Sequence, residues 1–268
     1  MAKRKNEIKK FEAPAGVPAH LAGAMEQDNS LSTLKEYRTV PRVKIIQGMT
    51  AQDLKDRFGE GSCILRPGDV LFLDKQDSVK LVPIGMYVEY CKWSDLRDNE
   101  SPAIMDRSFD KTSDIARRAA SADLRFETYE GEAGKNNPKT YRYVEHRIFI
   151  CVVYSDEHPL KGEVLAIDFS RGEFGAGTNF INGCVMRKVP LWSQIWECSP
   201  AFRDRGDKKW WGLDMNAPSD DPEDSFIKED EVDFFQELNS EWQDLIESKR
   251  VVVEHDHDED DDADGKFD

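Results

Sequence analysis

The sequence contains no long apolar run and almost none of the short motifs that mark an enzyme. None of its segments reaches the ~18 consecutive apolar residues of a membrane span, and residues 1–16 lack the apolar region of a secretory signal. The catalytic motifs G-x-S-x-G and H-E-x-x-H are absent. We therefore expect a cytoplasmic protein without membrane contact, catalytic residues, metal ions or cofactors.

Cysteine is scarce and forms no metal-binding or disulfide pattern. The five cysteines are widely spaced, odd in number and never arranged as C-x-x-C. Most lie in apolar runs, such as Ile148–Val153. In a reducing compartment this pattern predicts buried free thiols. The five residues are Cys63, Cys91, Cys151, Cys184 and Cys198.

The segment Gly172–Gly177 (GEFGAG) is the nearest approach to a nucleotide-binding motif. It lacks the Lys-Ser/Thr of a P-loop, and its glycine spacing is not G-x-G-x-x-G. We interpret it as a tight turn that needs positive φ angles. A nucleotide- or nucleic-acid-processing enzyme that uses this loop remains an alternative. The two histidines of His255–Asp258 lie in a charge run, where we expect no metal site.

The net charge of -16 is concentrated at one end of the chain. Of the 53 acidic and 37 basic residues, 21 and 4 follow Pro218, so the last 50 residues carry a net -17 and residues 1–218 carry +1. The low overall pI therefore describes the C-terminal region, and residues 1–218 are compatible with a nucleic-acid partner.

Composition divides the chain into three parts. Residues 1–39 are predicted to form a flexible basic arm, because the first ten residues hold five basic side chains and Ala13–Gly23 is rich in Pro, Gly and Ala. Residues 40–218 form the main domain. Residues 219–268 form an acidic region with a helix at about 229–249 and a disordered tail at 250–268. The apolar stripe that predicts this helix consists of Phe235, Leu238, Trp242, Leu245 and Ile246.

The main domain has the pattern of a mainly β protein. Many short β-branched and aromatic runs are separated by Gly- and Pro-containing turns, which is typical of a barrel or sandwich. Val79–Trp93 is a long strand interrupted at Pro83 and Gly85, as an edge or a bulge would be. Asp110–Ala122 is the one helical insertion, with Ser113 or Asp114 as its cap. Further strands are predicted at Val43–Gln47, Asp69–Leu73, Leu124–Tyr129, Tyr141–Tyr154, Glu163–Ser170, Gly183–Arg187, Trp192–Cys198 and Lys209–Met215.

Basic and aromatic residues alternate throughout Glu163–Met215. Cations that neutralise phosphates and rings that stack on unpaired bases are the combination that single-stranded nucleic acid requires, with stacking worth ~1–3 kcal/mol per base. The alternative is that the rings fill a core. The adjacent Trp210 and Trp211 weaken that alternative, because neighbours in a strand point to opposite faces.

A second candidate surface lies in the predicted strand Tyr141–Tyr154. Tyr141, Tyr143, Arg147 and Phe149 share one face, and Val144 to Val152 at alternate positions form the other, which we assign to the core. His146 falls on the core side and is expected to be a buried, hydrogen-bonded histidine. Arg117 and Arg118 of the helical insertion extend the positive surface, or alternatively form a solvated helix face.

Several blocks resemble phage-encoded single-stranded DNA-binding proteins. The resemblance covers about Val40–Met215 and implies an OB-like barrel that coats exposed strands during DNA replication or recombination. The acidic tail with the near-terminal Phe267 is similar to tails of many such proteins. The blocks are Val40–Gln47, Tyr90–Trp93, Val164–Asn179, Pro190–Cys198 and Lys209–Leu213.

The sequence thus favours a non-catalytic, largely sequence-independent binder of single-stranded DNA. Its acidic tail would compete for the DNA groove and recruit replication or recombination proteins. The alternative is an acidic protein-interaction or DNA-mimic protein with the β domain as scaffold. The candidate DNA-binding residues are Trp93, Arg117, Arg118, Tyr141, Tyr143, Arg147, Arg171, Arg187, Lys188, Lys208, Lys209, Trp210 and Trp211. The candidate partner-binding residues are Asp260, Asp261, Asp262, Asp264, Phe267 and Asp268.

Overall fold

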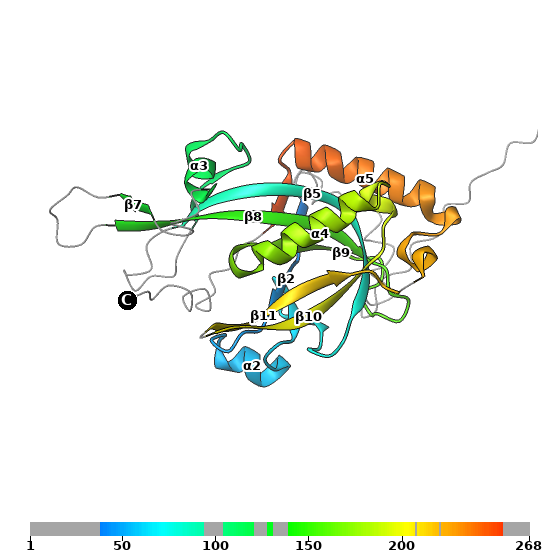
Figure 1. The fold of residues 1–268 in the computed structure, drawn as a ribbon, viewed down its shortest axis with the longest axis horizontal. Helices are drawn as coiled ribbons and strands as arrows, with labels where there is room; N and C mark the ends of the chain where they lie inside the picture. Colours follow the sequence, from blue (N-terminus) through cyan, green and yellow to red (C-terminus); the bar gives the residue numbers. More distant parts are fainter. Residues whose placement is uncertain are drawn as a thin grey trace, which may run out of the picture. The chain divides into compact units, whose positions relative to one another are not determined.

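The computed structural model describes residues 38–93, 104–120, 128–130, 139–206, 208–219 and 221–253. It is mainly β, as the sequence predicts, with helices inserted between strands (Figure 1). The strands are β1 (Arg38–Val40), β2 (Arg42–Ile45), β3 (Cys63–Arg66), β4 (Val70–Leu73), β5 (Val79–Trp93), β6 (Ile104–Ser108), β7 (Thr128–Glu130), β8 (Lys139–Val153), β9 (Val164–Phe169), β10 (Trp196–Arg205), β11 (Lys208–Asn216) and β12 (Val251–Val253). The α-helices are α2 (Gln52–Phe58), α3 (Asp114–Ala120), α4 (Phe174–Met186) and α5 (Val232–Glu247). Short 3-10 helices are η3 (Arg171–Glu173), η4 (Leu191–Ser193), η5 (Pro222–Ser225) and η6 (Glu229–Glu231).

Ten strands form one sheet in the order β11-β10-β5-β8-β9-β2-β3-β4, with β6 paired to β5 and β7 to β8. Neighbours are antiparallel apart from β2 and β9, which are parallel. Within the described residues the path ends at β11 and at β4, and no closed barrel is found. The OB-like barrel expected from the sequence is therefore not confirmed.

The centre of the sheet is the long antiparallel pair β5–β8, in which each strand has 15 residues (Figure 1). The register shifts between Pro83 and Gly85, so the bulge that these residues predict is confirmed. A Cβ at Gly85 would lie 2.8 Å from Ile246 of α5, so the glycine allows the helix to approach the strand closely.

Both faces of this pair are buried, which differs from the sequence prediction of a single core face. Phe149, Cys151 and Val153 of β8 enter one core together with Phe180 and Cys184 of α4. The alternating residues of β8 from Ile148 to Val152 enter a second core beneath α5. Because α4 and α5 cover opposite faces of β8, successive residues of this strand are apolar.

The C-terminal helix is confirmed as amphipathic. Phe235 and Trp242 are buried, and the remaining stripe residues pack against the same core. Asn239 donates a hydrogen bond to the Ile84 carbonyl at 2.7 Å, which links the helix to β5. The helix α5 therefore packs on the β domain and is an integral layer of it.

The boundary of the acidic tail differs from the prediction. The sequence predicts a disordered tail at residues 250–268, but Val251–Val253 form β12, which pairs with β1. Val251 and Val253 are 5% and 1% exposed and join Val40 in the core beneath α5. Three consecutive valines have high β propensity and can be buried, so the apolar character outweighs the charged surroundings.

The interpretation of Gly172–Gly177 as a turn is wrong, and so is a strand at Gly183–Arg187. These residues form η3 and the helix α4. A Cβ at Gly177 would lie 2.5 Å from Phe169, and one at Gly183 would lie 2.7 Å from Trp196. The glycines are therefore needed for close helix packing and not for positive φ angles.

The predictions for the cysteines, for His146 and for the cap of α3 are confirmed. All five cysteines are free and buried. His146 is 3% exposed, and its Nδ1 lies 2.7 Å from Oδ2 of Asp168. Ser113 accepts a hydrogen bond from the Ala116 amide and thereby caps α3. In the described part of the chain, no helix is long and apolar enough to span a membrane.

Candidate nucleic-acid interface

The β10–β11 hairpin carries aromatic and basic side chains beyond the end of the core. Phe202 pairs with Trp211, and Arg203 with Trp210, so the two pairs lie on opposite faces. The buried Leu213 lies on the same face of the hairpin as Phe202. Phe202 nevertheless lies outside the core and is 51% exposed, with its ring centroid 5.3 Å from that of Trp211 in an edge-to-face arrangement.

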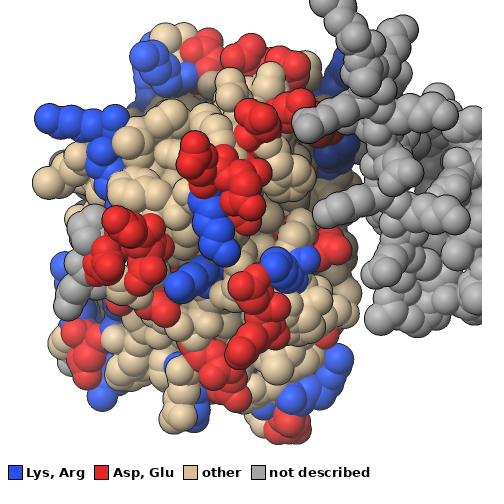
Figure 2. Space-filling model, turned by 90° about the vertical axis from the view of Figure 1, so that its right-hand side faces the viewer, with Lys and Arg blue, Asp and Glu red and all other residues tan. Residues whose placement is uncertain are grey.

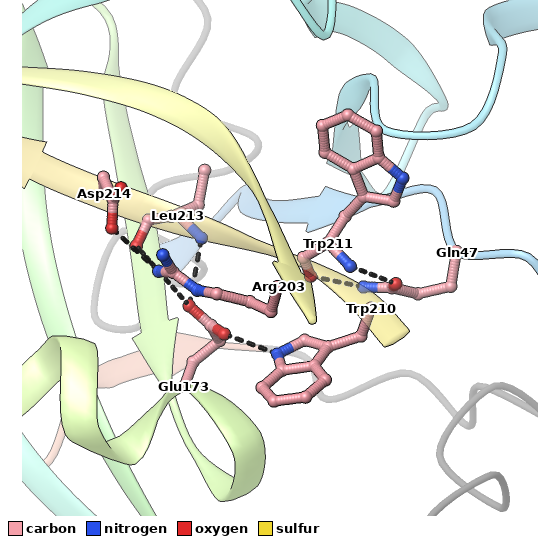
Figure 3. A network of polar contacts seen from close by, with 7 residues as sticks. All are labelled: Gln47, Glu173, Arg203, Trp210, Trp211, Leu213 and Asp214. Carbon is pink, nitrogen blue, oxygen red and sulfur yellow. Dashed lines mark hydrogen bonds and ion pairs between the residues drawn. The ribbon is translucent and has the colours of Figure 1, made fainter. Parts of the chain in front are cut away.

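The backbone of Trp211 forms hydrogen bonds with a side chain, as it would with a neighbouring strand. The Gln47 amide, from the loop after β2, donates to the Trp211 carbonyl at 2.7 Å and accepts from the Trp211 N–H at 2.9 Å (Figure 3). Beneath the indole lies Gly61, where a Cβ would approach Trp211 to 2.7 Å and where φ is +89°. These contacts bring the β11 edge of the sheet next to the loops that flank β2 and β3.

Trp210 belongs to a polar network centred on Glu173 (Figure 3). The Glu173 carboxylate accepts hydrogen bonds from Trp210 Nε1 at 2.8 Å, from the Leu213 amide at 3.1 Å and from Arg203 at 3.2 Å. Arg203 also donates to Asp214 at 2.8 Å and to the Leu213 carbonyl at 3.2 Å. Burial lowers the pKa of Arg203, but the hydrogen bonds to Asp214 and Glu173 outweigh it and raise the pKa above its usual value.

The free end of the hairpin is basic. Arg205 and Lys208 pair across the strands, and Lys209 pairs with Asp204. The Lys209 and Asp204 side chains are 62% and 53% exposed at 3.5 Å, so their ion pair is weak and Lys209 remains accessible to another anion. The hairpin thus combines exposed cations with exposed ring surface.

A second cluster lies along β8 on the face shared with Phe149. Lys92 of β5 lies 3.9 Å above the ring of the half-buried Tyr141. Further along, the Arg147 guanidinium lies 3.6 Å above Phe174 and donates to Thr178 at 2.6 Å. Lys92, Phe174 and Phe202 are not among the candidate residues predicted from the sequence, and the strand register places Lys92 opposite Tyr143.

Two rings that were expected to stack on bases are buried. Trp93 is 4% exposed and packs with Cys91 and Val144. Tyr143 is 3% exposed, with Arg118 5.3 Å from its ring centroid. Neither ring offers an open face, so both are removed from the candidate interface.

The basic candidates are divided among several places. Arg187 packs 3.7 Å above Trp196 and donates to the carbonyls of Ile195 and Ser225, so it has a structural role, and burial lowers its pKa. Lys188 is exposed, but it follows the far end of α4, about 20 Å from Glu173 by helix length.

Arg117 and Arg118 lie on α3, which packs on β8 and β5, whereas Arg171 lies in η3. Arg117 is exposed, and both arginines of α3 pair with Asp114 of the same helix. Arg171 is half-buried in η3, next to Gly172, which lies against Trp210. The six partner-binding candidates, Asp260, Asp261, Asp262, Asp264, Phe267 and Asp268, lie outside the described residues.

The described residues show no arrangement for metal chemistry. Among them, no group of three or more His, Cys, Asp or Glu side chains could hold a metal ion. The glycine-rich segment does not present a free phosphate loop either, because the Glu173 carboxylate occupies its start and would repel a phosphate. Comparisons with protein-family models, with curated proteins and with solved structures gave no match.

Proposed function

We propose that the chain binds single-stranded DNA without catalysis and largely without sequence preference. The observation that carries this proposal is the β10–β11 hairpin, where the exposed ring of Phe202 lies beside Trp211 and the exposed Lys209. Exposed rings can stack on any unpaired base, and lysines neutralise phosphates. The cluster of Lys92, Tyr141 and Arg147 along β8 would extend the path of the strand.

An OB-like barrel is part of this proposal. The sheet is antiparallel except at one pair, α4 fills one core, and the Gln47 amide links β11 to the loop after β2. A side-chain bridge of this kind supports a partly open barrel, as the OB fold has.

The role in phage DNA replication or recombination, with a tail that gates the groove and recruits other proteins, rests on the sequence. Residues 254–268 carry nine acids and one lysine. A polyanion of this kind would compete with DNA for a cationic surface, so its removal should tighten DNA binding at low salt. The chain should be truncated after Val253, because β12 and α5 form part of the core.

A pair of exposed phenylalanines provides a matched test. Phe202 and Phe234 are 51% and 59% exposed, but only Phe202 lies beside basic residues, whereas Phe234 lies on the acidic helix α5. Phe202→Ala should weaken binding of a labelled oligo-dT in fluorescence anisotropy by about five- to tenfold, since it removes one stacking ring. Phe234→Ala should leave the affinity unchanged. Equal effects of the two substitutions would argue against the hairpin as the interface.

A second candidate function is docking of a basic protein, with the β domain as scaffold. Asp233, Glu237 and Asp244 are exposed on α5, and none forms an ion pair with another described residue. Asp233 is adjacent to the exposed Phe234 in the sequence, and Glu237 lies one helical turn further on. Figure 2, which views the side at the right of Figure 1, shows clusters of acidic side chains with basic ones between them. This candidate predicts that residues 1–253 do not bind oligo-dT even at low salt.

A further inference from the structure

A carboxylate lies in the middle of the proposed DNA-binding hairpin. The side chain of Glu173 is 16% exposed and contacts Trp210, Arg203 and the Leu213 amide. A negative charge near bound DNA opposes binding by charge repulsion alone. Its presence at this position therefore calls for a compensating role.

The structure around the two tryptophans suggests that role. Trp211 is fixed through its backbone by Gln47 and through its ring by Gly61. Trp210 lies on the opposite face, where its indole N–H has the Glu173 carboxylate as its hydrogen-bond acceptor at 2.8 Å. Gly172, the residue before Glu173, leaves space for the same edge of the ring, since a Cβ there would lie 3.3 Å from Trp210 Nε1. The η3 segment thus holds one edge of Trp210.

The position of Glu173 is itself fixed by the fold. A Cβ at Gly212 would lie 2.2 Å from the carboxylate oxygens, so only glycine at this position leaves room for Glu173. The Leu213 amide and Arg203 hold the second oxygen, which leaves Oε1 directed at the indole. Hydrogen bonds to a charged group are shorter and stronger than those between neutral groups.

We propose that Glu173 is a positioning residue for DNA binding, which fixes the Trp210 indole in the orientation that stacks on an unpaired base. This inference rests on the proposed function. A hydrogen bond in the plane of the ring restrains rotation of the side chain and leaves the π faces for a base. Fixing the ring before binding reduces the entropy that is lost when a base stacks on it. Arg203 remains paired with Glu173 and Asp214 and is not a phosphate contact.

The test uses the sign of the effect on affinity for oligo-dT, measured by anisotropy with the full chain. Removing a negative charge should strengthen DNA binding if charge is the only role of Glu173. The proposal instead predicts that Glu173→Ala weakens binding by about fivefold, as the loss of a positioned stacking ring outweighs the reduced repulsion. Glu173→Gln keeps one acceptor oxygen in place of the two that Glu173 uses, so its affinity should lie between those of Glu173→Ala and the unsubstituted chain.

A second background separates positioning from general damage to the fold. Trp210→Phe retains an aromatic ring but has no N–H for Glu173 to accept. In this background Glu173→Ala should strengthen binding by about twofold, because only the charge effect remains. Damage to the hairpin would weaken binding in both backgrounds. The matched control is Glu60→Gln, at an exposed acid beside Gly61 that takes no part in the network and should not weaken binding.

Each outcome has a defined meaning. The proposal is supported if Glu173→Ala weakens binding in the natural background and strengthens it in the Trp210→Phe background. Strengthening in both backgrounds, or weakening in both, overturns it while leaving single-stranded DNA binding intact. Absence of oligo-dT binding by the unsubstituted chain overturns the proposed function and with it this inference.

Discussion

Two adjacent phenylalanines of α5 should differ sharply in their contribution to stability. Phe235 is 3% exposed and contacts Tyr154 at a centroid distance of 6.1 Å, whereas Phe234 is 59% exposed. Truncation of a buried phenylalanine to alanine typically costs about 3–5 kcal/mol of unfolding free energy. For Phe234→Ala the loss should stay below about 1 kcal/mol, because only its edge-to-face contact with Phe235 is removed. Both substitutions gain the same helix propensity, so that effect cancels in the comparison.

Urea denaturation followed by circular dichroism measures this difference. With a slope of about 2–3 kcal/mol per M, Phe235→Ala should lower the unfolding midpoint by roughly 1–2 M, and Phe234→Ala should shift it only slightly. If both variants unfold at the midpoint of the unsubstituted chain, α5 does not belong to the core. The sequence prediction of a main domain that ends at Pro218 would then be correct.

Two further perturbations test the packing of the hairpin and of the thiols. Gly61→Ala should cost about 1–3 kcal/mol and weaken oligo-dT binding, because φ is +89° and the new Cβ would collide with Trp211; Gly206→Ala, at φ +65° with open space around it, should cost less by urea titration and leave binding intact. All five thiols should resist Ellman's reagent at pH 8 until the protein unfolds, and rapid labelling of the folded chain would contradict their burial. Burial raises the pKa of Cys184 and Cys198 to about 12. These pKa values lie above those in the unfolded chain, so the free energy of unfolding should be highest below about pH 8.5 and should fall as the pH rises toward 12. The urea midpoint should therefore be lower at pH 10 than at pH 7.

Elements with strong local periodicity could be predicted from the sequence. The stripe from Phe235 to Ile246 fixed the type and the buried side of α5, and alternation along Tyr141–Tyr154 placed Ile148 and Phe149 on opposite faces. The bulge at Gly85 followed from Pro and Gly inside an apolar run. In each case the signal is local, because one segment contains the whole pattern.

Elements whose glycines serve tertiary contacts could not be predicted. In α4, Gly177 packs against Phe169 of β9 and Gly183 packs against Trp196 of β10. Both partners lie outside the helix, so the sequence of the helix does not reveal them. Local propensity assigned Gly177 to a turn and Gly183 to a strand, because glycine disfavours helices when no packing compensates. The burial of Trp93 depends in the same way on contacts across strands, with Val144 among them.

The candidate site was predicted in part. The sequence identified Trp210 and Trp211 as rings on opposite faces, and the structure agrees with that alternation. It did not reveal Gln47 and Glu173, which reach the tryptophans from the loop after β2 and from η3. Such long-range polar contacts have no local signature, so only the three-dimensional structure shows them.

The most direct test of the account compares single-stranded and double-stranded DNA. Binding of labelled oligo-dT and of a duplex of equal length is measured by anisotropy at two salt concentrations, for the full chain and for residues 1–253. The account predicts that both proteins prefer the single strand, that the shorter one binds more tightly at low salt, and that salt weakens both through counterion release. If residues 1–253 bind neither DNA at low salt, the hairpin is not a nucleic-acid interface and the account is contradicted.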